Sequence, residues 1–124
     1  MTMKRILVVD DSDTVRQQVC MALKQAGFVT AEAADGREGL AAVDANRSID
    51  MVISDVNMPN MNGLEMIEKV KSKPENKALP ILMLTTEGQP SMIKRAKEAG
   101  AAGWIVKPFD AKQLVAAAKH LTKA

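Results

Sequence analysis

Five short apolar runs, each followed by a segment with helical spacing, are the feature that most restricts how this 124-residue chain can fold. The runs cover residues 6–9, 29–31, 51–54, 81–84 and 104–106. Three of them are continuously apolar, which is typical of strands buried on both faces of a parallel sheet. The run at 29–31 is more mixed, and we expect it at an edge. The alternation predicts an α/β fold in which right-handed crossovers place helices on both faces of the sheet.

The segments between the runs carry the signals of helix ends. The apolar residues of segment 15–26 fall on one helical face, and Gly27 provides the stop. Asp35, Asn62 and Asp110 each stand three residues before a Glu or Gln, which is the spacing of a capping box. These three residues therefore predict the first turns of the second, third and fifth helices.

The fourth helix is less well defined by the sequence. Gly100 marks its end, but its start near residues 89–90 has only a weak signal. Five strand–helix units of about 25 residues each fill the chain and leave no room for a linker. We therefore expect one domain over residues 1–124.

Composition excludes several classes of protein. The apolar runs are far shorter than the roughly 20 residues that a membrane span needs, and the first of them stops at Asp10, too early for a signal peptide. A lone Cys20 cannot form an internal disulfide, so we expect a reducing, cytoplasmic location. The sequence predicts neither secretion nor membrane insertion.

The charge is unevenly distributed although the net value is only +2. Residues 1–62 contain 6 Lys or Arg and 9 Asp or Glu, whereas residues 63–124 contain 11 and 6. A basic half suggests nucleic-acid binding. Aromatic residues, however, are limited to two Phe and one Trp, too few for a platform on which bases stack. We interpret the lysines as the polar faces of helices and expect no nucleic-acid partner.

Polar residues that carry chemistry follow four of the five runs. Asp10 and Asp11 follow the first run, and Asp55 follows the third. Thr85 follows the fourth run and Lys107 the fifth. Ligands of such sheets bind at the carboxyl ends of the strands, where these side chains meet. A helix cap would explain one Asp at a strand end but not three with a Lys, so the pattern predicts a functional site.

The charges at this predicted site favour a divalent cation. Three carboxylates and one ammonium leave a net charge of −2, and two carboxylates 4–5 Å apart repel by roughly 4 kcal/mol at an effective dielectric constant near 20. Oxygen ligands without Cys or His indicate Mg²⁺ rather than Zn²⁺. A metal beside a carboxylate nucleophile, a Lys and a hydroxyl supplies the parts for phosphoryl transfer. Asp55 stands alone on its strand and is the candidate nucleophile, whereas Asp10 and Asp11 are candidate metal ligands.

The sequence resembles the receiver domains of two-component response regulators, especially the stand-alone members that act in chemotaxis. The resemblance rests on the motifs at residues 6–11, 55–63, 84–87 and 106–109 and covers essentially the whole chain. It implies a single-domain flavodoxin-like (βα)5 fold with strand order 2-1-3-4-5. It also implies a receiver domain over residues 1–124 without an output domain, that is, a signalling switch rather than an enzyme.

The resemblance assigns roles to the acidic residues. Asp55 becomes the residue that accepts a phosphoryl group from a histidine kinase. Asp11, the Asp55 carboxylate and the backbone carbonyl of Asn57 become direct ligands of Mg²⁺. Asp10 is expected to act largely through a metal-bound water.

The resemblance also assigns roles to the residues that sense the phosphoryl group. Thr85 and Lys107 are expected to bind its oxygens, and the Lys107–Pro108 bond is expected to be cis. Asn57 and Glu87 are expected to tune dephosphorylation toward fast turnover. Trp104 stands where the family usually has Tyr or Phe. We expect it to be half-buried and less able to rotate fully inward.

The output is expected to be a protein contact on the face formed by the fourth helix, fifth strand and fifth helix. The candidate residues on that face are Lys94, Arg95, Lys97, Trp104, Lys112 and Lys119. They favour a partner with acidic residues and an apolar anchor, such as a flagellar motor switch protein or another chemotaxis output protein. The kinase is expected to dock beside residues 10–16, and a phosphatase is a further expected partner.

Three alternatives remain open. An intermediate carrier in a phosphorelay would use the same site, although Asn57 and Glu87 disfavour the long-lived phosphoryl group that a carrier needs. An adaptor receiver stays open beside the carrier, whereas a binding module that keeps the fold but is not phosphorylated is disfavoured by the complete set of site residues. A haloacid dehalogenase-type phosphatase would use Asp11 as its nucleophile, and segment 11–15 fits that signature. Such enzymes need a further acidic pair after the Lys, and only Asp110 follows.

Overall fold

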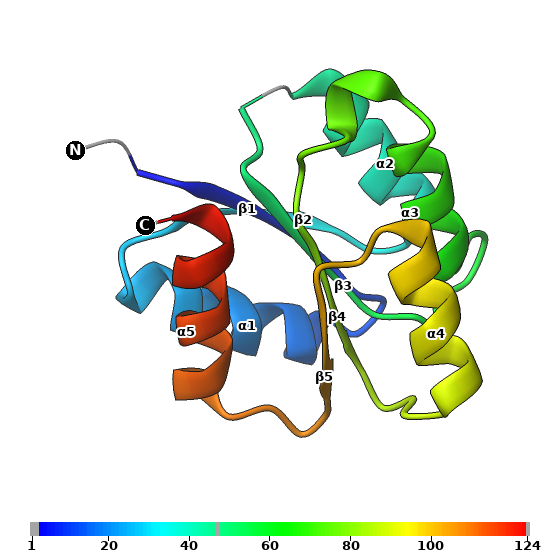
Figure 1. Ribbon diagram of the computed structural model, residues 1–124. Helices are drawn as coiled ribbons and strands as arrows, with labels where there is room; N and C mark the ends of the chain where they lie inside the picture. Colours follow the sequence, from blue (N-terminus) through cyan, green and yellow to red (C-terminus); the bar gives the residue numbers. More distant parts are fainter. Residues whose placement is uncertain (1–2, 47, 124) are drawn as a thin grey trace.

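The computed structural model describes residues 3–46 and 48–123 and contains one parallel five-stranded sheet in the order β2-β1-β3-β4-β5 (Figure 1). The strands are β1 (Arg5–Val9), β2 (Val29–Ala33), β3 (Met51–Ser54), β4 (Ile81–Thr85) and β5 (Gly103–Val106). The helices are α1 (Asp13–Gln25), α2 (Gly36–Ala45), α3 (Gly63–Lys71), the short 3₁₀ helix η1 (Pro74–Asn76), α4 (Pro90–Ala99) and α5 (Ala111–Thr122). The flavodoxin-like fold and strand order are confirmed, and the mixed run at β2 lies at an edge.

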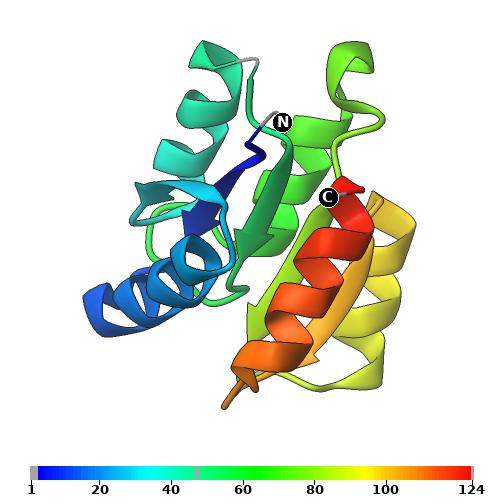
Figure 2. The same cartoon turned by 90° about the vertical axis from the view of Figure 1, so that its left-hand side faces the viewer.

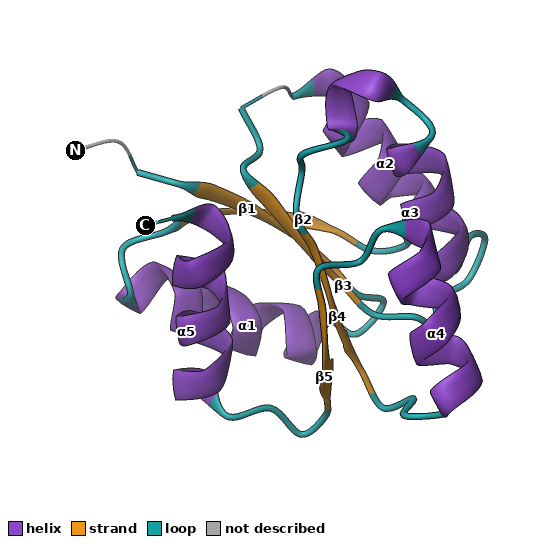
Figure 3. Ribbon diagram, in the orientation of Figure 1, coloured by secondary structure: helices purple, strands orange, loops and turns teal. Residues whose placement is uncertain are grey.

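Helices cover both faces of the sheet, with α1 and α5 on one side and α2, α3 and α4 on the other (Figures 1 and 3). Figure 2 views the molecule from the side of α1 and α5. Successive residues of a strand point to opposite faces. Thus Ile6 and Val8 pack with α1 and α5, whereas Leu7 and Val9 pack with the other three helices. Burial on both faces explains why the central strands read as continuous apolar runs.

Two of the three predicted helix caps have the predicted hydrogen-bond partner, and the third has a different one. The side chains of Asp35 and Asn62 each accept a hydrogen bond from the backbone N–H three residues later, both at 2.9 Å. Asp110 caps α5 as predicted, but it accepts from Lys112 rather than from Gln113, at 2.9 Å. Spacing therefore located the three helix starts, while local backbone geometry decided the partner of the third.

The first turn of helix α4 lacks a side-chain cap, which agrees with the weak start signal in the sequence. Gln89 is its N-cap and makes no side-chain capping bond, and Pro90 occupies the first position, where a missing N–H costs nothing. The helix ends at Gly100, whose φ of 107° lies in the left-handed region that favours glycine. Within residues 3–46 and 48–123, no helix has both the length and the apolar character that crossing a bilayer requires.

The register of the sheet brings the carboxyl ends of the central strands together. Val9 of β1 pairs with Ser54 of β3, and Thr85 of β4 pairs with Val106 of β5. The residues that follow these strands therefore emerge at one edge of the sheet. This edge carries the candidate site.

Candidate functional site

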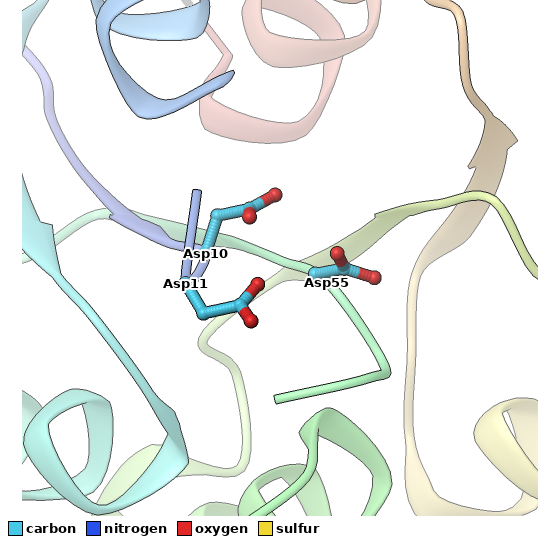
Figure 4. A group of neighbouring side chains, drawn as sticks. All are labelled: Asp10, Asp11 and Asp55. Carbon is cyan, nitrogen blue, oxygen red and sulfur yellow. The ribbon is translucent and has the colours of Figure 1, made fainter. Parts of the chain in front are cut away.

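Three aspartates converge at the ends of β1 and β3 (Figure 4). Asp55 follows β3 directly, and its backbone N–H donates to the carbonyl of Val9 at 3.0 Å, which brings it beside Asp10. Asp10, Asp11 and Asp55 each offer one carboxylate oxygen, and these oxygens lie within 4.8 Å of one another. The structure thus brings together the three carboxylates that the sequence predicted.

The carboxylates differ in burial and in how they are held. Asp10 and Asp55 are only 3% and 8% exposed, whereas Asp11 is exposed. Asp10 Oδ1 accepts from the backbone N–H of Ser12 at 2.9 Å, and its carbonyl accepts from the guanidinium of Arg16. Neither supporting residue was predicted from the sequence. Ser12 could have been found as the N-cap of α1, while Arg16 carries no comparable signal.

The backbone after β3 fixes one oxygen of Asp55. Asp55 Oδ1 accepts hydrogen bonds from the N–H groups of Val56 at 2.6 Å and Asn57 at 3.4 Å. Its other oxygen, Oδ2, accepts from Lys107. The carboxylate is therefore oriented by its own loop on one side and by a cation on the other.

Lys107 links two of the carboxylates. Its ammonium donates to Asp10 Oδ2 at 2.7 Å and to Asp55 Oδ2 at 2.9 Å. Its backbone N–H donates to the carbonyl of Thr85 at 2.7 Å, which holds the loop after β5 against β4. The Lys107–Pro108 peptide bond is cis, as the resemblance implied.

Burial and pairing shift the pKa values of this cluster. Burial raises the pKa of Asp10 above its ordinary value, and the hydrogen bonds from Lys107 and Ser12 offset this only in part. Burial alone would lower the pKa of Lys107, but its hydrogen bonds to Asp10 and Asp55 and their charges raise it. Lys107 therefore stays charged at neutral pH, which leaves one cation among three carboxylates.

The raised pKa of Lys107 predicts a loss of stability in alkali. A raised lysine pKa adds stability that is complete below the unfolded-state value of 10.5 and disappears as pH rises through the folded-state pKa. We expect urea unfolding of the metal-free protein to show this loss above the unfolded-state value, with a slope of at most about 1.4 kcal/mol per pH unit for the one proton involved. Lys107→Met should lack this component, and the exposed Lys112→Met should keep it. Equal alkaline slopes in the two variants would contradict the pairing.

Glu87 contacts two of the residues predicted for the switch and one predicted to tune dephosphorylation. The buried Thr85 hydroxyl accepts from the backbone N–H of Glu87 at 3.2 Å. The Asn57 amide donates to Glu87 Oε1 at 2.7 Å, and the Trp104 indole donates to the Glu87 carbonyl at 2.9 Å. Trp104 is half-buried, as expected from the sequence. One residue in the loop after β4 thus connects the Asp55 loop to β5.

The residues present fit a bound Mg²⁺. Their carboxylates form an all-oxygen donor set, which this hard cation prefers, and two positive charges would offset the excess negative charge. The exposed position of Asp11 leaves room for the waters that Mg²⁺ retains. Asp11, Asp55 and the backbone carbonyl of Asn57 would hold the ion, with Asp10 beside it.

The residues predicted for the partner face on α4 do not all point in the same direction. Lys94 and Lys97 are exposed on α4. Arg95, in contrast, forms an ion pair with Glu68 of α3, with 2.9 Å between Nη2 and Oε1. The guanidinium is therefore directed toward α3 rather than toward β5.

The two lysines predicted on α5 do not form one basic surface with those on α4. Lys112 and Lys119 line a groove between α5 and α1. Val106 at the end of β5 is an apolar residue that was not predicted for this face, and it is 48% exposed. Alternation along β5 could have found it, because Ile105 is buried and Trp104 and Val106 point to the opposite face.

Comparison with known proteins agrees with this geometry. A family model described as "Response regulator receiver domain" matches residues 6–119. The chain therefore belongs to the receiver domain family of response regulators. Among the relatives that it resembles are CheY proteins of chemotaxis. One is chemotaxis protein CheY1 of Helicobacter pylori (strain ATCC 700392 / 26695), which is 42% identical over 106 residues, covering 85% of this chain and 86% of the relative.

Solved structures extend the likeness to the whole fold. The chemotaxis response regulator CheY4 of Vibrio cholerae superposes with a TM-score of 0.90 at 45% identity, covering 97% of this chain and 99% of that one. A CheY from Borrelia burgdorferi, solved as a CheX–CheY–BeF3–Mg complex, superposes with a TM-score of 0.87 at 27% identity, covering 95% and 88%. The chain is thus a CheY-like receiver domain, a class of signalling switch.

Proposed function

We propose that the chain controls chemotaxis or motility by accepting a phosphoryl group on Asp55 from a histidine kinase, in a Mg²⁺-dependent reaction. The observation that carries the proposal is the position of the Asp55 carboxylate, which lies within 4.8 Å of the Asp10 and Asp11 oxygens and is hydrogen-bonded to Lys107. This arrangement combines a nucleophile, a metal site and a cation, which are the components of phosphoryl transfer.

In the proposed transfer, an oxygen of Asp55 forms a bond to phosphorus as the bond from phosphorus to the donor's histidine nitrogen breaks. The electron pair of the broken bond returns to that nitrogen. Lys107 supplies positive charge beside the accepting carboxylate, and the Val56 N–H holds Oδ1. Mg²⁺, when bound, offsets the negative charge of the carboxylates and of the phosphoryl oxygens.

Removal of the phosphoryl group is proposed to involve Asn57 and Glu87. Their side chains are hydrogen-bonded to each other at 2.7 Å, and Asn57 is two residues from Asp55. A polar pair at this position is suited to orient a water for attack on the phosphorus. Rapid loss of the group favours a chemotaxis regulator over a phosphorelay carrier, which remains the second candidate.

The switch is proposed to act through Thr85, Glu87 and Trp104. In this structure the Thr85 hydroxyl is engaged by the Glu87 N–H, and the Glu87 carbonyl is engaged by Trp104. If the Thr85 hydroxyl moves away from Glu87 to donate to a phosphoryl oxygen, it releases the Glu87 N–H. The two hydrogen bonds thus give phosphorylation a route to β5 by shifting the balance between two arrangements.

The proposed partners are proteins. A histidine kinase would dock beside residues 10–16, and a chemotaxis output protein such as a flagellar motor switch protein would bind the face around α4 and β5. The exposed Lys94 and Lys97 with the apolar Val106 suit an acidic segment with an apolar anchor. The B. burgdorferi CheX–CheY complex supports a protein partner for this class of fold.

A fluorescence experiment tests the proposed switch. Trp104 is the only tryptophan and the chain has no tyrosine, so the emission reports one site. We expect beryllofluoride with Mg²⁺ to change the Trp104 emission and to increase retention of the cognate output protein on the immobilised chain. Asp55→Asn, in the same reagents, should show neither effect. Equal retention with and without beryllofluoride would contradict a phosphorylation-dependent output.

A further inference from the structure

The loop between β3 and α3 carries Asn57, yet it lies outside the sheet ladder and needs other contacts to hold its shape. Its base is secured where the N–H of Gly63 donates to the carbonyl of Val56 at 2.8 Å. Its outer part contacts the start of α2 instead, through Asn60 and Met61. The part of the loop that follows Asn57 is thus tied to a helix that contributes no residue to the site itself.

A buried carboxylate at the start of α2 holds this loop. Asp35 is 6% exposed and uses its two oxygens for different purposes. Oδ1 caps α2 through the N–H of Glu38 at 2.9 Å, and Oδ2 accepts from the side-chain amide of Asn60 at 2.7 Å. Asn60 has a φ of 67°, in the left-handed region that Asn tolerates better than most residues. The Asp35–Asn60 hydrogen bond therefore supports a loop residue in an uncommon conformation.

A second contact beside this hydrogen bond fixes the same segment. The N–H of Gly36 donates to the carbonyl of Met61 at 3.0 Å. A Cβ at position 36 would overlap that carbonyl oxygen and would lie 2.9 Å from Met61 Cγ. The backbones of α2 and the loop are thus in direct contact, and two adjacent loop residues are tied to two adjacent residues of α2.

We propose that Asp35 is a positioning residue for the Mg²⁺ site, acting through Asn60 to hold the loop so that the Asn57 carbonyl faces the three aspartates. The inference rests on the proposed function, because it concerns the affinity of the same site for its metal. The reason is geometric: Asn57 and Asn60 are three residues apart in one short loop, so a change at Asn60 reorients the peptide groups before it. Residues that support a metal ligand without touching the metal typically change affinity by 10- to 100-fold.

The test is a titration of the purified protein with Mg²⁺ alone, followed by the NMR shifts of backbone amides. Asn60→Gly removes the side-chain bond, keeps the charge and accepts the positive φ, so we expect it to fold with nearly unchanged stability. Its dissociation constant for Mg²⁺ should rise about 10-fold. Asp35→Asn, which can still cap α2, should show a similar rise.

Asp50→Asn is the matched control. Asp50 also accepts a backbone hydrogen bond, from Arg5 at 2.9 Å, and it lies at the opposite end of the sheet. Its loss of charge equals that of Asp35→Asn, and its Mg²⁺ affinity should stay within about twofold of the parent, because a screened distant charge contributes little. Unchanged affinity in Asn60→Gly, or equal weakening in Asp35→Asn and Asp50→Asn, would overturn the positioning role.

Hydrogen exchange separates this inference from the proposed function. In the metal-free protein, amides of residues 57–61 should exchange faster in Asn60→Gly than in the parent, whatever the metal does. Failure of the parent chain to bind Mg²⁺ would refute the proposed metal site. Equal exchange rates in the two proteins would refute the positioning role, even if the parent binds Mg²⁺ as proposed.

Discussion

Asp55→Asn is expected to abolish labelling of the chain by a small phosphodonor such as phosphoramidate in the presence of Mg²⁺. The amide nitrogen of Asn is not a nucleophile, and the remaining amide oxygen can still accept the hydrogen bond that the Val56 N–H gives to Oδ1. The fold should therefore survive while the accepting group is lost. Intact-protein mass spectrometry checks the result, since each phosphoryl group adds a fixed mass.

Asp11→Asn tests whether Asp11 is a metal ligand or the nucleophile. Asp11 is exposed and lies with Asp10 and Asp55 in the predicted metal cluster, so its loss should slow labelling by weakening Mg²⁺ binding. The label should still be found on Asp55 after peptide mapping. A label on Asp11 in the parent chain would instead support the haloacid dehalogenase-type phosphatase, which uses that residue as its nucleophile.

The lifetime of the label distinguishes a chemotaxis regulator from a phosphorelay carrier. Asn57 and Glu87 are in direct contact beside Asp55, and we propose that they speed hydrolysis. The label should therefore decay within minutes once the donor is removed. A label that persists for hours would contradict rapid turnover and favour the phosphorelay carrier.

The candidate site was predictable because its members follow buried strands. Asp10, Asp55 and Lys107 each come at or just after the end of an apolar run, and parallel strands bring such residues to one edge. The sheet order and the cis Lys107–Pro108 bond came from the resemblance, because neither local spacing nor composition determines them. Glu87 and Asn57 are 30 residues apart, and only the family pattern joined them before the structure did.

Contacts between helix surfaces were not predictable in the same way. The sequence places Arg95 and Lys112 on helices, but the direction in which a helical side chain points depends on how the helix packs. Arg95 is drawn to Glu68 of α3, and Lys112 lines the groove beside α1. The Asp35–Asn60 hydrogen bond was not predicted from the sequence, for a related reason. The capping signal at Asp35 uses only one of its two oxygens, and nothing local indicates the partner of the other.

Gly63→Ala is expected to destabilise the protein by about 3 kcal/mol or more and to impair labelling at Asp55. Gly63 is the first residue of α3 and is buried against the backbone of Asp55. A Cβ there would overlap the Asp55 carbonyl oxygen and would lie 2.9 Å from Met83 Cε. Its φ lies outside the left-handed region, so the requirement for glycine is one of space rather than of conformation.

The obstacle at Gly63 is backbone, which cannot move aside as a flexible side chain can. Either α3 shifts away, which breaks the 2.8 Å hydrogen bond from the Gly63 N–H to Val56, or Asp55 shifts, which separates it from Lys107. Gly88→Ala is the matched control, because its Cβ would meet only Val106 Cγ2, at an ordinary 3.6 Å. Urea unfolding and the initial rate of labelling measure the two effects. A Gly63→Ala protein as stable and as quickly labelled as Gly88→Ala would show that the close packing of α3 on Asp55 does not hold the nucleophile in place.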